Sequence, residues 1–143
     1  MKRNVLCALA AIAIFGCAEQ VVLEKLPPVN PANAGEVVVV RPSAFIGEDV
    51  VFVVNVDQKD VAELGARQYQ RLQLPAGDHR IGVRCFGALS GWSEAAITHR
   101  VVAGQTAYLA VAPKHGCASV DPVPESEGSK LLLNTGSRPG WRQ

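Results

Sequence analysis

The sequence has little net charge of either sign and few aromatic residues. Its formal net charge is +1 over 143 residues, and Phe, Trp and Tyr make up 6% of the chain. A surface for nucleic acid needs a basic excess gathered on one face. A chain this close to neutrality does not provide that excess, so we exclude nucleic acid as a partner.

The chain also lacks an apolar run long enough to cross a membrane. Crossing the hydrocarbon takes about 20 apolar residues, and the run from Val5 to Phe15 is shorter than that. No second run approaches this length. Any attachment to a bilayer therefore has to come from something other than a spanning helix.

None of the common catalytic patterns is present. Ser90 lies in GALSGWS, which does not have the Gly-x-Ser-x-Gly spacing of a nucleophile elbow. The sequence contains no Gly-rich phosphate loop, no pair of carboxylates expected on one face and no His-Glu-x-x-His helix. We therefore predict no catalytic residue, no cofactor and no enzymatic activity.

The three histidines have structural explanations. His79 follows a Pro-Gly turn at the start of an expected strand, where an imidazole commonly hydrogen-bonds to nearby backbone. His99 stands beside Arg100 and is expected in solvent. A metal site would need three or four ligands, and His115 with Cys117 supplies two. We expect no metal site.

What is present is a distinctive N-terminus. Two cations, Lys2 and Arg3, precede the apolar run, and small residues follow it, which is the plan of a secretory signal peptide. Cys17 comes directly after Ile14, Phe15 and Gly16. This stretch resembles the lipobox of bacterial lipoproteins, in which an aliphatic, a variable and a small residue precede the cysteine that is lipidated.

The resemblance implies that residues 1–16 are removed as a lipoprotein signal peptide and that Cys17 is acylated. Two or three acyl chains on one residue make a stable membrane anchor, whereas one chain binds only marginally. Ala18 follows the cysteine where an aspartate would resemble an inner-membrane retention signal, so we expect an outer-membrane anchor with the domain in the periplasm. The alternative is a plain signal peptide or a buried helix, with Cys17 an ordinary thiol.

The lipobox also bears on the other cysteines. Cys7 would leave with the signal peptide and Cys17 would carry lipid, which leaves Cys85 and Cys117. In an oxidising compartment outside the cytoplasm, two remaining cysteines are more often bridged than free. We predict a disulfide between them.

Removal of 16 of the 143 residues leaves 127, a size typical of one domain. Residues 17–35 contain three prolines and no sustained period, and are expected to form an extended linker after the lipidated cysteine. Residues 36–113 are expected to form the folded domain. Residues 114–143 are rich in Pro, Gly and Ser, and we predict a largely irregular C-terminal tail in which only KLLLN could add a strand.

The folded domain has the pattern of an all-β protein. In HRIGVRC, the residues Ile81, Val83 and Cys85 share one parity while Arg80 and Arg84 share the other, which is typical of a half-buried strand. Similar β-branched or alternating runs recur about every 8–12 residues. They predict a small antiparallel β-sandwich of about seven strands, in EVVVVR, DVVFVVNVD, QKDVAEL, ARQYQRLQL, HRIGVRC, EAAITHRVV and TAYLAVA.

The turns between these runs carry a second resemblance. The domain resembles a family of bacterial lipoproteins with a domain of unknown function, akin to the PEGA-type β-sandwich. The resemblance implies a fold and a location but no activity. Gln58 departs from it, because the family usually has glycine after the aspartate of this turn. The matching positions are Pro75, Gly77, His79, Ala103, Gly104, Gln105 and Tyr108.

Two tryptophans are candidates for partner contacts. Trp92 is expected in a Gly-flanked loop, where it either binds a glycan or protein or plugs the end of the sandwich, and Trp141 lies near the C-terminus.

The sequence thus predicts a membrane-anchored envelope lipoprotein with a non-catalytic β-sandwich module. Its partners would be the bilayer, through Cys17, and an unidentified envelope protein or glycan. The alternative is a small periplasmic hydrolase or redox protein that uses His79, His99 or Cys85.

Overall fold

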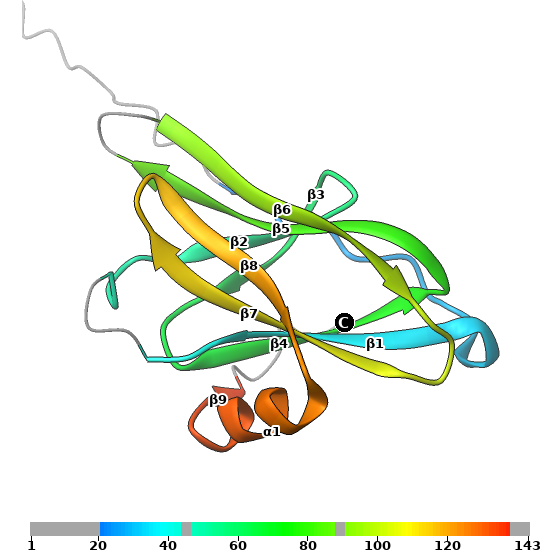
Figure 1. Ribbon diagram of the computed structural model, residues 1–143. Helices are drawn as coiled ribbons and strands as arrows, with labels where there is room; N and C mark the ends of the chain where they lie inside the picture. Colours follow the sequence, from blue (N-terminus) through cyan, green and yellow to red (C-terminus); the bar gives the residue numbers. More distant parts are fainter. Residues whose placement is uncertain (1–20, 44–46, 88–90, 138–143) are drawn as a thin grey trace, which may run out of the picture.

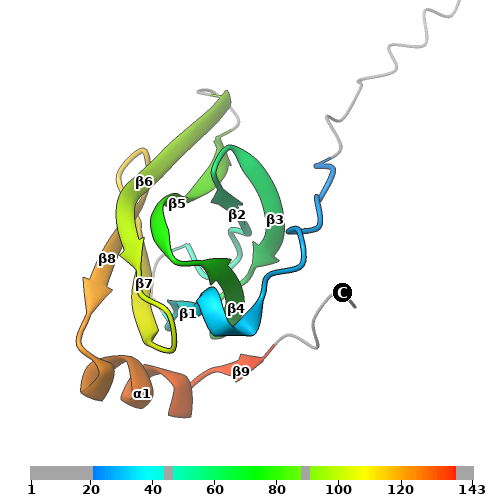
Figure 2. The ribbon, with the colours of Figure 1, turned by 90° about the vertical axis from the view of Figure 1, so that its right-hand side faces the viewer.

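The structure, a computed structural model, describes residues 21–43, 47–87 and 91–137. The expected signal peptide, Cys17 and Trp141 lie outside these residues. The described residues form two facing sheets, as Figure 2 shows in a view along the strands. One sheet has the order β3-β2-β5-β6, and the other has the order β8-β7-β1-β4 with the two-residue β9 added beside β4. The prediction of an all-β, sandwich-like fold is confirmed.

Seven of the strands correspond to the runs expected from the sequence, and two lie beyond them (Figure 1). The strands are β1 (Ala34–Arg41), β2 (Phe52–Val56), β3 (Lys59–Leu64), β4 (Gln68–Pro75), β5 (Gly77–Gly87), β6 (Gly91–Val101), β7 (Thr106–Lys114), β8 (Cys117–Val123) and β9 (Gly136–Ser137).

The sandwich is not purely antiparallel, which corrects the expectation. β1 pairs antiparallel with β4 but parallel with β7, and β9 also runs parallel to β4. The reason lies in the turn after β6, where Gly104 N donates to Ala34 O (2.9 Å) and Glu36 N donates to Gln105 O (2.9 Å). This turn delivers β7 to the end of the sandwich at which β1 begins, so the two strands run in the same direction.

The core lies between the two inner faces. Ile81, Val83 and Cys85 point into it from β5, as their alternation predicted, and face Leu109 and Val111 of β7. These five side chains are at most 5% exposed. Burial of apolar surface contributes about 25 cal/mol for each Å² removed from water and is the main term that holds the two sheets together.

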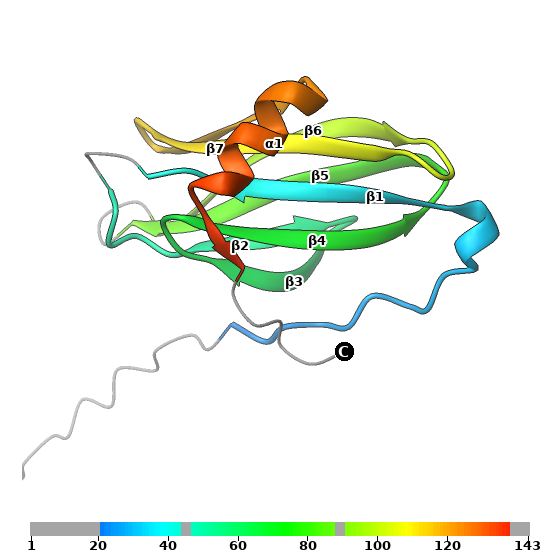
Figure 3. The same cartoon turned by 90° about the horizontal axis from the view of Figure 1, so that it is seen from below.

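Of the expected tail, the described residues 114–137 are folded, so the prediction of a largely irregular tail is wrong for them. They form β8, then α1 (Glu125–Leu133), then β9, and the leucines of KLLLN lie in α1 and not in a strand. Figure 3 shows α1 lying across β1 and β7. There it covers an outer face on which Val38 and Val40 have no exposed surface. The helix has nine residues, and the part of the chain that is described contains no helix long and apolar enough to span a bilayer.

The expected linker is extended but lies against the domain. Glu24 N donates to Asp60 O of β3 (2.6 Å), and Leu26 packs against the core. A short 3₁₀ turn, η1 (Pro31–Asn33), then leads into β1. The segment 21–30 therefore covers the edge of β3, just as β9 covers the edge of β4.

Candidate functional site

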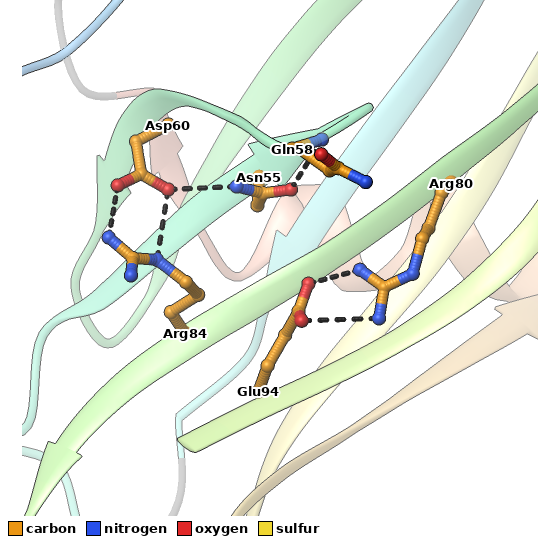
Figure 4. A pocket seen from close by; sticks show the side chains of 6 residues that line it. All are labelled: Asn55, Gln58, Asp60, Arg80, Arg84 and Glu94. Atoms are coloured by element: carbon orange, nitrogen blue, oxygen red, sulfur yellow. Dashed lines mark hydrogen bonds and ion pairs between the residues drawn. The ribbon is translucent and has the colours of Figure 1, made fainter. Parts of the chain in front are cut away.

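The outer face of the β3-β2-β5-β6 sheet carries a shallow hollow of about 260 Å³. Figure 4 shows that its polar side chains come from neighbouring strands and from the turn between β2 and β3. The lining residues are Asn55, Gln58, Asp60, Arg80, Arg84 and Glu94.

The alternation of β5 creates this hollow. Because Ile81 and Val83 point inward, Arg80, Gly82 and Arg84 point outward. Gly82 lies between the two arginines, packed closely against β6, because a Cβ there would lie 2.4 Å from Ala95 O and 2.5 Å from Ala96 Cβ. The sequence predicted this outward parity but not which carboxylates the arginines would meet.

The charges of the hollow neutralise one another. Arg84 makes two hydrogen bonds to Asp60, with 3.0 Å between Nε and Oδ1, and Asn55 Nδ2 donates to the same Oδ1 (2.9 Å). Arg80 makes two hydrogen bonds to Glu94. The hydrogen bonds and charge of Glu94 raise the pKa of Arg80 above its usual value. A charged ligand would have to displace one of these pairs, so the hollow is a poor ionic site.

Beside the hollow lies an apolar group that we call the aromatic patch, formed by Val51, Phe86 and Trp92. The Phe86 and Trp92 rings meet edge to face with centroids 5.5 Å apart, and the guanidinium of Arg84 lies 4.5 Å from the Trp92 ring centroid. Phe86 is 61% exposed and Val51 46% exposed. Continuing the β2–β5 register, in which Val53 faces Arg84, places Val51 opposite Phe86.

The setting of Trp92 differs from the expected loop. Trp92 is the second residue of β6 and is the direct partner of Phe86 across the β5–β6 ladder. Phe86 and Val51 were not among the contact residues predicted from the sequence. A signal for Phe86 was available, because it continues the outward parity of Arg80 and Arg84.

His79 joins two turns. Its Nδ1 lies 2.7 Å from Asp57 Oδ2 and its Nε2 lies 2.9 Å from Pro75 O, so the ring contacts nearby backbone as the sequence suggested. Asp57 also accepts from Arg80 N (2.9 Å). Partial burial would raise the pKa of Asp57, but the hydrogen bonds from His79 and Arg80 and the charge of His79 lower it overall. His99 lies opposite His79 in the β5–β6 ladder.

The predicted disulfide is confirmed. Cys85 of β5 and Cys117 of β8 are bonded, with their Cα atoms 5.6 Å apart. These strands belong to different sheets, so the bridge ties one layer of the sandwich to the other.

The buried Arg41 was not predicted from the sequence either. It continues the inward parity of Val37 and Val39 and has no exposed surface. Its guanidinium donates to the carbonyls of Gly47, Val50 and Leu64 and lies over the Phe52 ring, 4.3 Å from the centroid. Burial lowers its pKa, although the charges of Glu48 and Asp49 act in the opposite direction. These bonds hold the residues before β2 against the core, which is a structural role.

Within residues 21–43, 47–87 and 91–137, no group of three or more His, Cys, Asp or Glu side chains is placed to hold a metal ion. Comparisons of the chain with protein-family models, curated proteins and solved structures give no match. The resemblances to bacterial lipoproteins and to the PEGA-type sandwich therefore stay predictions.

Proposed function

We propose that this protein is a membrane-anchored envelope lipoprotein whose β-sandwich is a non-catalytic binding or structural module. The observation that carries the proposal is the Cys85–Cys117 disulfide between the two sheets. Structural disulfides persist in oxidising compartments and are rare in the cytoplasm. The bridge therefore supports export, which is the step that the N-terminal signal would direct.

The anchor in this proposal is Cys17, acylated after removal of residues 1–16. In this proposal the anchor lies in the outer membrane and the domain in the periplasm. Ala18, at the position where an aspartate would resemble an inner-membrane retention signal, favours the outer membrane. The lipid bilayer is then one partner, and an envelope protein or glycan is another. The residues proposed to contact a partner are Trp92, in the aromatic patch, and Trp141.

The contacts of His79 and Cys85 weigh against a hydrolase or redox protein. Both ring nitrogens of His79 already face acceptor oxygens, on Asp57 and Pro75. Cys85 is 5% exposed and bonded to Cys117, so its sulfur is neither ionised nor open to a substrate.

The test is incorporation of radiolabelled palmitate by bacteria that express the full chain. We expect label in the wild type and in Cys7→Ser, the matched control within the signal peptide, and loss of label in Cys17→Ser. Label that persists in Cys17→Ser, or that never enters the wild type, would refute the anchor. Fractionation of inner and outer membranes then tests the location.

Thiol titration of the folded protein tests the proposal that the domain is not a redox protein. Cys85 and Cys117 should resist alkylation until a reductant is added. Rapid alkylation of Cys85 in the untreated protein would favour a redox function instead.

A further inference from the structure

The aromatic patch places exposed apolar side chains at one end of the sandwich. Val51 immediately precedes β2 and Phe86 lies near the end of β5, and these two strands are antiparallel neighbours. Val50, next in the chain, is exposed as well. A cluster of exposed apolar and aromatic side chains on a small domain usually marks a contact surface.

The N-terminal segment leads toward the same end. η1 and the start of β1 lie at the opposite end, where Ala34 pairs with Pro75. Traced back from Asn30, the segment runs along β3 and is held there by the hydrogen bond of Glu24 to Asp60. Figures 1 and 3 show that its first described residues point toward the end at which β5 finishes and β6 begins.

Because the segment from Val21 onward lies against the domain, the tether between domain and membrane is only the stretch from Cys17 to Val21. Val21 is half-buried, and Cys17 precedes it by four residues. Four residues span at most about 14 Å in any conformation. The eleven-residue strands β5 and β6 are each about 36 Å long. A tether less than half as long as the strands does not let both ends of the domain approach the membrane equally.

We propose that the aromatic patch rests on the surface of the lipid bilayer in which Cys17 is anchored. This inference rests on the lipidation proposed above and adds the orientation of the domain to it. Trp is enriched at the level of the lipid headgroups, because its ring is apolar while its N–H is polar. Phe86 and Val51 supply apolar area beside it, and such area strengthens attachment at an interface.

The charged side chain beside the patch is already neutralised, which favours an uncharged apolar surface such as a bilayer over a charged partner. Arg84, which lies over Trp92, is already paired with Asp60. The attraction would therefore come mainly from apolar contact, and it should depend little on salt or on the charge of the lipid headgroups.

The experiment uses the lipidated full-length protein in phosphatidylcholine vesicles made with or without brominated acyl chains, which quench nearby tryptophan. The chain has two tryptophans, so Trp141→Phe leaves Trp92 as the reporter. We expect a loss of Trp92 fluorescence in the brominated vesicles.

The matched control is the triple variant Trp92→Phe, Trp141→Phe, Val102→Trp. Val102 is 45% exposed in the turn after β6, at the other end of the sandwich. Both proteins carry the same anchor, so any difference in quenching reports the orientation of the domain. We expect no loss of fluorescence in the control.

A second variant tests the patch itself. Val51→Ser combined with Phe86→Ser, in the Trp141→Phe background, removes exposed apolar groups while the core stays intact. Circular dichroism verifies the fold. We expect this variant to lose most of the Trp92 quenching.

Other outcomes would overturn the inference. Equal quenching of Trp92 and of the control tryptophan, or no quenching of Trp92, refutes the orientation while the palmitate label keeps the anchor. A Trp92 signal that responds to peptidoglycan fragments but not to brominated lipid makes the patch a glycan site. If Cys17 takes up no palmitate, the proposed lipid anchor is refuted, and this result is distinct from the test of orientation.

Discussion

Asp57 and Gln58 form the turn between β2 and β3 with unusual backbone angles for residues other than glycine. Their φ values are 49° and 69°, in the left-handed region, which costs roughly 1–2 kcal/mol for a residue with a Cβ. Asp57 offsets this cost through hydrogen bonds to His79 and Arg80 N. At Gln58 the turn is held by a hydrogen bond from the backbone N of Gln58 to the side-chain Oδ1 of Asn55 (3.1 Å).

Gln58→Gly should therefore stabilise the protein. Glycine adopts the left-handed region without steric cost, and the bond from backbone N to Asn55 is kept, so we expect the free energy of unfolding to rise by about 1 kcal/mol. Urea denaturation measures the change. Gln73→Gly is the control, because Gln73 is in the extended strand β4 and its replacement should lower stability by roughly 0.5–1 kcal/mol. A loss of stability in Gln58→Gly would contradict the strain argument.

Asp57→Asn tests the carboxylate. The pKa of Asp57 is lowered in the folded protein, so its contribution to stability is full above the unfolded value of about 4 and is lost as pH falls through the folded pKa. Asparagine also tolerates the left-handed backbone, so the turn survives. We expect the variant to be less stable at pH 7 by under about 1 kcal/mol, since the carboxylate is half exposed.

Thermal unfolding of wild type and Asp57→Asn at several pH values tests this prediction. The difference between the two proteins should shrink below about pH 4. A difference that stays constant from neutral to acidic pH would mean that packing, and not the charge of Asp57, stabilises the turn.

At the scale of elements, the seven strands from β1 to β7 could be predicted because each bears its own pattern. Ile81 and Val83 alternate with Arg80 and Arg84 whatever the rest of the chain does. β8 and α1 bear no such local pattern. α1 is a polar helix that contains Gly128, which lowers helix propensity. It forms because it packs on the outer face of the β8-β7-β1-β4 sheet, and such a contact between distant segments leaves no local sequence pattern.

In the candidate site, features set by one strand could be predicted, whereas contacts between strands could not. The outward parity of Arg84 follows from β5 alone. The pairing of Phe86 with Trp92 depends on where β6 begins, and Gly91 and Trp92 read equally well as loop residues. The inward position of Arg41 was visible in its parity with Val39, but a buried arginine is rare enough that parity alone does not establish it.

Gly128→Ala tests how α1 packs. A Cβ at this position would lie 2.2–2.6 Å from atoms of Tyr108, so the helix would have to move away from β7. Overpacking of this kind costs about 1–3 kcal/mol, which exceeds the gain of up to about 1 kcal/mol in helix propensity. We expect a less stable protein with faster amide hydrogen exchange in α1. Ser129→Ala, at an exposed position of the same helix, should leave both nearly unchanged.

At the scale of the whole molecule, the two open sides of the sandwich are closed by different means. On one side, segment 21–30 covers the edge of β3 and β9 covers the edge of β4. On the other side, β8 lies beside β5 and β6, and the Cys85–Cys117 bond joins the two sheets. Exposed strand edges invite aggregation, so these covered edges help to keep the domain dispersed.

The disulfide should contribute a measurable share of the stability of this arrangement. Bridges that close loops of this size typically stabilise a small domain by about 2–4 kcal/mol. We expect Cys85→Ala combined with Cys117→Ala to lose that amount in urea denaturation, and we expect a reductant to destabilise the wild type but not the double variant. Equal stability of the wild type with and without reductant, once thiol titration shows the bond to be reduced, would mean that packing of β8 against β5 and β6 holds the sheets together without the bond.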